Sequence, residues 1–215
     1  MAKRPVFICR KGAPYFFDRM VDFEFFGGFA LSQKQKCVLS LHESAKRRDP
    51  KLNLLEISRA STVELGQKLS AFNLTYTHEN AEVYTVESVF QASKVFEHGG
   101  PYVDLLTQPS NVAKKDSRLK GSGRIVGFNF LGTQFPSRPM TAFYDWIYIN
   151  ALYQHEELHE ELLQYNAFTD IAFNPEKSIN CQARSVAIFV ALKEQGLLEY
   201  VLTDFEVFKS VVYRG

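Results

Sequence analysis

The segment of residues 85–96, TVESVFQASKVF, is the part of the sequence that most limits what this chain can fold into. Its polar residues Glu87, Gln91 and Lys94 are spaced four and three apart, which would place them on one face of a helix. Nearly all the other residues are apolar or small, whereas a surface helix carries only a narrow apolar stripe. The sequence therefore predicts a buried helix whose carboxylate, amide and amine converge inside the protein.

Two interpretations of this polar face stay open at the level of the pattern. In the first, Glu87 and Lys94 are solvated charges on a partly exposed helix, and Glu97 pairs with Lys94 across one turn. In the second, the three polar residues form a candidate site. Short motifs often match by chance, so the rest of the chain has to decide.

The composition is that of an ordinary globular protein, with 46% hydrophobic and 23% charged residues among 215. A formal net charge of +1 means that any contact with a polyanion has to come from a local patch. Cys9, Cys37 and Cys181 are odd in number and far apart, which argues against a disulfide framework. We expect reduced thiols in a cytoplasmic protein, without a signal peptide or a membrane-spanning segment.

The local patterns predict more helix than strand. Runs rich in Val, Ile and aromatic residues predict strands at residues 5–10 and 13–26, followed by a helix at 32–48 and a short strand at 52–58. Further elements are expected as helices over 61–72, 141–165 and 180–194 and in the C-terminal segment, and as strands over 124–131 and 170–174. The balance predicts a mainly α fold with a small N-terminal β element.

Residues 155–159, HEELH, formally match the zinc-protease pattern His-Glu-x-x-His. In that interpretation His155 and His159 bind one zinc ion from one helix face, and Glu156 is the general base. A charged residue, Glu157, stands where such motifs are normally uncharged, and no third ligand stands out downstream. We therefore interpret the run as a charged helix with two histidines at its margin, and expect no metal and no cofactor.

The central segment resembles the signature helix of the NADAR family, a Ser-x-Glu-His-x-x-Gln-x-x-Lys-Phe motif. Glu87, Gln91 and Lys94 match its Glu, Gln and Lys, while the family's frequent His is replaced. Upstream, LSAFNL at residues 69–74 is similar to the family's Leu-Ser-Asn-Phe block at about the same spacing.

Two downstream blocks extend the resemblance. FYDWIYINAL carries Trp146 where the family places a Trp at the start of a long helix, and SINCQARSVAIFVAL is similar to the closing helix. In detail, the sequence of these blocks is most similar to the branch of the family that accompanies DarT-type toxins. Residues 1–60 lie outside the common pattern, so we expect an N-terminal extension over 1–60 packed on a NADAR-like domain over 61–215.

The resemblance implies an antitoxin that hydrolyses the N-glycosidic bond between ADP-ribose and guanine in DNA, reversing the mark of a DarT-type toxin. Glu87 would transfer a proton or activate water. Lys94, desolvated in an apolar helix, would attack the opened sugar as a Schiff-base nucleophile, although the charge of Glu87 opposes its neutral form. Direct attack by water is the alternative route.

The same resemblance implies residues that hold ADP-ribose through hydrogen bonds, aromatic stacking and a helix N-terminus near the pyrophosphate. These are Ser70, Phe72, Asn73, Gln91, Trp146, Asn180 and Gln182. For Asn180 a plain N-cap and for Trp146 a core aromatic are equally open interpretations.

A polar and basic stretch follows the central segment and would contact nucleic-acid phosphates. Its candidate residues are Lys114, Lys115, Arg118, Lys120 and Arg124. A solvated loop is the alternative. Two other functions also stay open: an N-glycosidase acting on ribosylated pyrimidine intermediates of riboflavin synthesis, and a protein that binds ADP-ribose or the toxin without catalysis.

Overall fold

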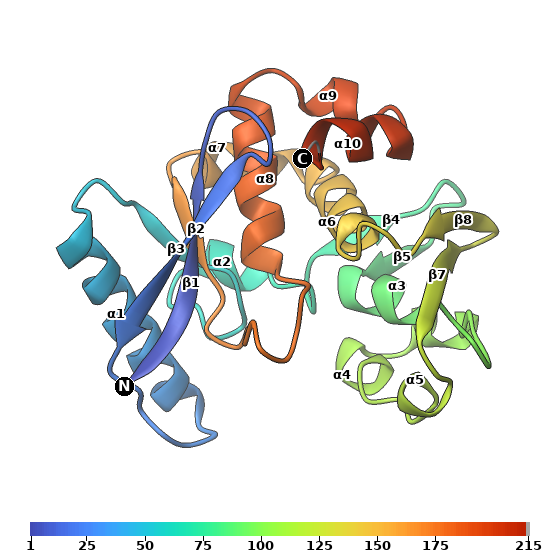
Figure 1. Cartoon of the computed structure of the whole chain (residues 1–215), viewed down its shortest axis with the longest axis horizontal. Helices are drawn as coiled ribbons and strands as arrows, with labels where there is room; N and C mark the ends of the chain where they lie inside the picture. The colour runs from blue at the N-terminus through green and yellow to red at the C-terminus, as the bar shows by residue number, and fades with distance from the viewer. Residues whose placement is uncertain (214–215) are drawn as a thin grey trace. The chain divides into compact units, whose positions relative to one another are not determined.

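The computed structural model of the chain describes residues 1–213 and divides into two compact units (Figure 1). The first unit is built from Met1–Ser70 together with His155–Gly215, and the second is the continuous segment Ala71–Gln154. The expected boundary after residue 60 lies inside the first unit. A separate N-terminal extension stays a prediction.

The first unit contains a four-stranded sheet in the order β2-β1-β9-β3. β1 (Ala2–Cys9) and β2 (Phe16–Phe23) pair with each other as an antiparallel hairpin. β9 (Ala167–Thr169) pairs antiparallel with β1 and parallel with β3 (Leu54–Glu56). Residues 5–8 in the middle of β1 are all buried, which requires that both faces of the sheet are covered.

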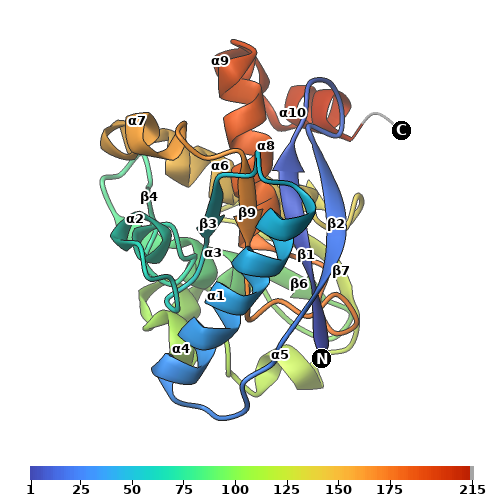
Figure 2. The same cartoon turned by 90° about the vertical axis from the view of Figure 1, so that its left-hand side faces the viewer.

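Two long helices provide that cover, with the sheet between them (Figures 1 and 2). α1 (Leu31–Arg48) packs on β2, and its Val38 and Leu41 join the core cluster that includes Val6 and Ile8 of β1. On the other face lies α8 (Gln182–Glu194), which contacts β1 and β9 and is buried along nearly its whole length. Smaller helical elements complete the unit: α2 (Glu64–Lys68), η2 (Glu156–Leu158), α7 (His159–Leu162), α9 (Leu198–Val201) and α10 (Phe205–Val212).

The second unit combines helices with a three-stranded antiparallel sheet, β6 (Lys94–Phe96), β7 (Ile125–Phe130) and β8 (Thr133–Pro136). An aromatic cluster joins them: Phe90 and Phe143 lie with their ring centroids 5.8 and 4.5 Å from that of Phe128. Phe90 belongs to α3 (Val86–Ala92) and Phe143 to α6 (Ala142–Tyr153). The remaining elements are β4 (Thr75–Thr77), β5 (Val83–Thr85), η1 (Val103–Thr107), α4 (Ser110–Ala113) and α5 (Arg118–Gly121).

The prediction of a mainly α fold is wrong, because the protein is a mixed α/β structure with 41% helix, 20% strand and three sheets. The N-terminal strands, the helix at 32–48 and the strand at 124–131 are confirmed. Five strands, β3, β4, β5, β6 and β9, have only three residues each. A strand of three residues is too short to show the alternation by which a strand is recognised in a sequence. The strand expected at 170–174 begins three residues earlier, at Ala167, and is β9.

The long helix expected over residues 141–165 is also wrong, because α6 ends at Tyr153. Gln154 holds the chain there: its side chain accepts a hydrogen bond from the Thr77 N–H (2.8 Å) and donates one to the Thr77 carbonyl (2.9 Å). His155 leaves helical geometry, with φ −104° and ψ 65°. The HEELH run therefore does not lie on one helix face. No helix within residues 1–213 is long and apolar enough to cross a membrane.

Two buried carboxylates lie at the carboxyl ends of the parallel strands β3 and β9. Glu56 accepts hydrogen bonds from the hydroxyls of Ser58 and Thr169, both at 2.6 Å. Asp170 accepts one from the Gln182 side-chain amide at 3.0 Å. Burial, with the charge of Glu56, raises the pKa of Asp170 to about 7. Near neutral pH the folded protein therefore holds a proton that the unfolded chain releases.

We expect the stability of the wild-type protein to fall as the pH rises, and Asp170→Asn to reduce this fall. Because the pKa of Asp170 is higher in the folded state, its stabilising contribution is complete below pH ~4 and is lost as the pH rises through about 7. Between pH ~5.5 and ~8 this loss is about 2 kcal/mol in the free energy of unfolding. Urea denaturation at the two pH values measures it. Asp18→Asn removes the same charge from an exposed position of β2. If it reduced the fall in stability as much as Asp170→Asn does, Asp170 would not be the cause of that fall.

Candidate functional site

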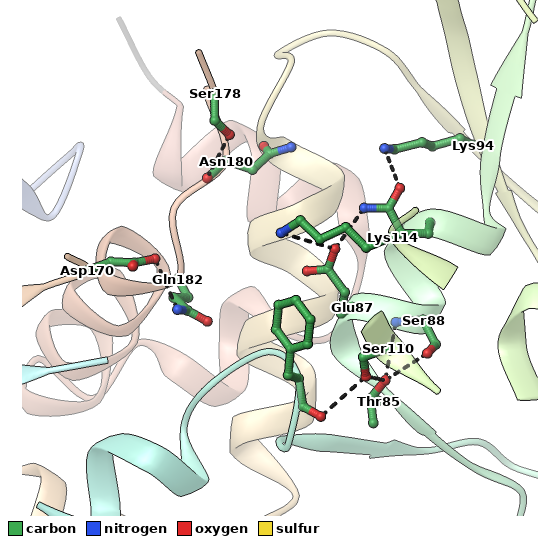
Figure 3. A network of polar contacts seen from close by, with 12 residues as sticks. Thr85, Glu87, Ser88, Lys94, Ser110, Lys114, Asp170, Ser178, Asn180 and Gln182 are labelled. Carbon is green, nitrogen blue, oxygen red and sulfur yellow. Dashed lines mark hydrogen bonds and ion pairs between the residues drawn. The ribbon is translucent and has the colours of Figure 1, made fainter. Parts of the chain in front are cut away.

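The start of α3 is held by a small network of hydroxyl groups (Figure 3). Thr85 is the N-cap, and its Oγ1 accepts a hydrogen bond from the Ser88 N–H at 3.2 Å. The same oxygen lies 2.7 Å from the hydroxyl of Ser110 on α4, which donates to the Phe72 carbonyl. This network satisfies groups at the buried helix start, where backbone donors lack partners within the helix.

Burial of the central helix is confirmed, because all seven residues of α3 are buried. Its predicted length is wrong: the helix ends at Ala92, and Lys94 begins strand β6, opposite Phe128 of β7. Ser93 ends the helix. Its hydroxyl donates a hydrogen bond to the Val89 carbonyl (2.7 Å), and its own carbonyl accepts one from the Asn129 N–H (2.7 Å). Pairing of β6 with β7 therefore replaces the last helical turn.

The three polar residues predicted to converge do so in a continuous chain of hydrogen bonds. Lys94 Nζ donates to Gln91 Oε1 at 2.7 Å, and Gln91 Nε2 donates to Glu87 Oε1 at 2.8 Å. Glu87 and Gln91 are only 4% and 6% exposed. The interpretation of Glu87 as a solvated surface charge is therefore wrong, as is the proposed pair of Lys94 with Glu97, whose carboxylate pairs with Arg124 instead.

A fourth residue, Lys114, lies against this chain. Its Nζ is 3.5 Å from Glu87 Oε1 and 5.0 Å from the centre of the Phe72 ring. The sequence predicts Lys114 as a nucleic-acid contact, and the structure places its amine beside Glu87 instead. The linear sequence carries no signal for that contact, because it depends on how residues 97–113 fold back onto α3.

The amine of Lys94 is poised between its charged and neutral forms. Burial lowers its pKa to about 8; Glu87 acts in the opposite direction, and Lys114 lowers it further. About one tenth of the Lys94 side chains are therefore neutral at pH ~7. The Nζ also lies 4.5 Å from the centre of the Phe90 ring, which favours the cation. Such an amine can act as a nucleophile near neutral pH.

The other expected ligand residues of the second unit differ in exposure. Asn73 is exposed, Phe72 is half-buried beneath the Lys114 ammonium group, and Trp146 is half-buried on α6. A Trp with part of its surface accessible fits a stacking role better than a core role. Their contact with a ligand stays a prediction.

Three expected ligand residues belong to the first unit. Ser70 is buried, and Gln182 donates to Asp170 as described above. Asn180 is not the N-cap of α8, a position held by Cys181. Among residues 1–213 the Oδ1 atom of Asn180 is buried without a hydrogen-bond partner. A buried amide oxygen without a donor is uncommon and is compatible with a role in ligand binding.

Two arginines of the basic stretch are neutralised by acidic neighbours. Arg118 pairs with Asp104 at 2.6 Å and with Asp116 at 2.9 Å, and Arg124 pairs with Glu97 at 2.7 Å. Lys115 and Lys120 are exposed and, within the described part of the chain, have no ion pair. These two lysines are the cations most available to a phosphate backbone. Over residues 1–213, no cluster of three or more His, Cys, Asp or Glu side chains could hold a metal ion.

A comparison with known protein families identifies the class of protein to which this sequence belongs, that of the NADAR proteins. The chain belongs to the family described as DarT1-associated NADAR antitoxin, whose pattern it matches over residues 2–215. The resemblance noted from the sequence is thereby confirmed, and the match includes residues 2–60. No curated protein matches the chain significantly. The family makes the protein an antitoxin that pairs with a DarT toxin, and NADAR proteins are generally glycosidase-like enzymes.

Proposed function

We propose that the protein is a glycohydrolase that removes ADP-ribose from guanine bases in DNA, and so reverses the modification made by its partner toxin. The observation that carries the proposal is the buried chain of Glu87, Gln91 and Lys94, in which the Lys94 amine has a lowered pKa of about 8. The association of the family with DarT1 favours this substrate over ribosylated pyrimidines of riboflavin synthesis.

The reaction begins when the ribose ring opens and leaves its anomeric carbon joined to the guanine nitrogen as an iminium group. The neutral Lys94 Nζ adds to that carbon, the guanine nitrogen takes up a proton, and the carbon–guanine bond breaks. An imine now joins Lys94 to the sugar. Water adds to the imine carbon, the carbon–Nζ bond breaks, and the sugar aldehyde leaves as free ADP-ribose while the amine is regenerated.

Glu87 is the group that accepts the proton of the attacking water. Its Oε1 is engaged by Gln91 and Lys114, whereas its Oε2 accepts no hydrogen bond from residues 1–213. An open carboxylate oxygen can receive a proton from water next to the anomeric carbon. The same oxygen would serve direct attack by water if Lys94 formed no covalent bond.

The remaining assignments follow the pattern of charge and exposure. Lys115 and Lys120 contact the DNA phosphates, a contact that weakens with salt. Phe72 and Trp146 stack on rings of the substrate, and Asn73 bonds its hydroxyls. For Ser70, Asn180 and Gln182 of the first unit, a role in ADP-ribose binding stays a prediction.

We expect the purified protein to release free ADP-ribose from guanine-ADP-ribosylated DNA without added metal, because the proposed route uses only an amine, a carboxylate and water. Chromatography of the released nucleotide measures the activity, with unmodified DNA as the blank. Binding of the modified DNA without release would favour the non-catalytic alternative. Loss of activity with EDTA and its recovery with zinc would contradict the metal-free route.

A further inference from the structure

Lys114 is held beside Glu87 by the fold around it. Its backbone N–H donates to the Ser110 carbonyl at 3.1 Å, and the Ser110 hydroxyl bonds to Thr85 at the start of α3. The base of the Lys114 side chain is therefore tied to the helix that carries Glu87. Its ammonium group lies over the Phe72 ring, although the side chain is 54% exposed.

The charges of the site are unevenly distributed. Glu87 is a buried carboxylate, and a buried charge is costly unless a cation or hydrogen bonds compensate it. Lys114 lies 3.5 Å from Glu87 Oε1, whereas Lys94 reaches the carboxylate only through the Gln91 amide. If Lys94 were the only cation available to Glu87, the pair would favour a protonated Lys94, which cannot attack a carbon.

We propose that Lys114 is a positioning residue: its ammonium group is the counter-ion of Glu87, so that Lys94 is not needed as a counter-ion and can serve as the neutral amine. The proposal rests on the function proposed above, because it explains how one lysine of the site becomes a nucleophile. It assigns the two lysines different roles around one carboxylate, and it removes Lys114 from the set of phosphate contacts.

The electrostatics of Lys94 agree with this division. The charged groups that act on it are Glu87 on α3, which raises its pKa, and Lys114 at the end of α4, which lowers it. The Gln91 amide and the Phe90 ring also contact the Lys94 amine, and neither carries a net charge. Removing the Lys114 charge eliminates a repulsion and leaves the Glu87 carboxylate to Lys94 alone. Both effects act in the same direction and favour protonated Lys94.

The test measures the ionisation of Lys94 itself, without substrate. Acetic anhydride acetylates only neutral amines, and mass spectrometry of the peptide that contains Lys94 gives its labelling rate as a function of pH. We expect Lys114→Gln and Lys114→Met to shift the midpoint upward by roughly one pH unit. Lys114→Arg keeps the charge and should keep the wild-type midpoint. Lys115→Gln removes the same charge one residue away, and should leave the midpoint in place.

Three outcomes would overturn the role of Lys114. The midpoint of labelling could stay unchanged in both neutral variants, or Lys115→Gln could shift it equally. The third is a midpoint in Lys114→Arg that differs from that of the wild type. Circular dichroism verifies that each variant is folded before labelling. The result is separable from the proposed function, because labelling needs no turnover. A shifted midpoint in a protein that releases no ADP-ribose would sustain the electrostatic role and reject the glycohydrolase.

Discussion

Lys94→Ala is expected to abolish release of ADP-ribose, with a fall in turnover of roughly 10³-fold or more, because the variant has no amine to form the imine. Reduction of the wild-type reaction with borohydride should trap a covalent adduct, since the reagent converts an imine into a stable secondary amine. Mass spectrometry of the digested protein should place the added ADP-ribosyl mass on Lys94. The variant should show no such mass.

Matched variants separate nucleophilic attack from charge. Lys94→Arg keeps a cation near Gln91 and Glu87, but a guanidinium group stays protonated and cannot attack, so it should be as inactive as the alanine variant. Lys209→Ala removes a lysine from α10 and should retain both turnover and adduct. If wild-type turnover proceeds in borohydride without any adduct, Lys94 only binds the substrate and water attacks directly.

The buried polar face of α3 could be predicted from the sequence because it depends only on local spacing and on the apolar character of its neighbours. The end of the helix could not. Ser93 and Lys94 leave the helix because the backbone of β7 offers pairing at Asn129 and Phe128, and that partner lies more than thirty residues away in sequence. The three polar side chains still converge, because Lys94 reaches Gln91 from the strand.

The contact between Lys114 and Glu87 could not be predicted from the sequence. In the sequence it is one of several basic residues in a polar stretch, with nothing to distinguish it from Lys115. In the fold, the hydroxyl contacts of Ser110 tie α4 to the start of α3 and bring the two adjacent lysines into different surroundings. The break of the long helix at Gln154 has the same origin, because it depends on hydrogen bonds to Thr77, far away in sequence.

Glu87→Gln tests the second catalytic role with little change in shape. The glutamine oxygen can still accept hydrogen bonds from Gln91 and Lys114, so we expect a melting temperature close to that of the wild type. The amide cannot take a proton from water, and turnover should fall by about 10²- to 10⁴-fold. Differential scanning fluorimetry and the release assay measure the two quantities on the same preparation. Glu79→Gln, at an exposed position of the same unit, is the control for charge.

The same variant distinguishes the two routes of attack. In the covalent route Glu87 acts when the imine is hydrolysed, so Glu87→Gln should accumulate the Lys94 imine and give more borohydride-trapped adduct than the wild type. In direct attack no imine exists, and the variant should yield neither adduct nor product. Retained turnover in Glu87→Gln would leave the carboxylate as a structural group of the buried chain, with Lys114 as its counter-ion.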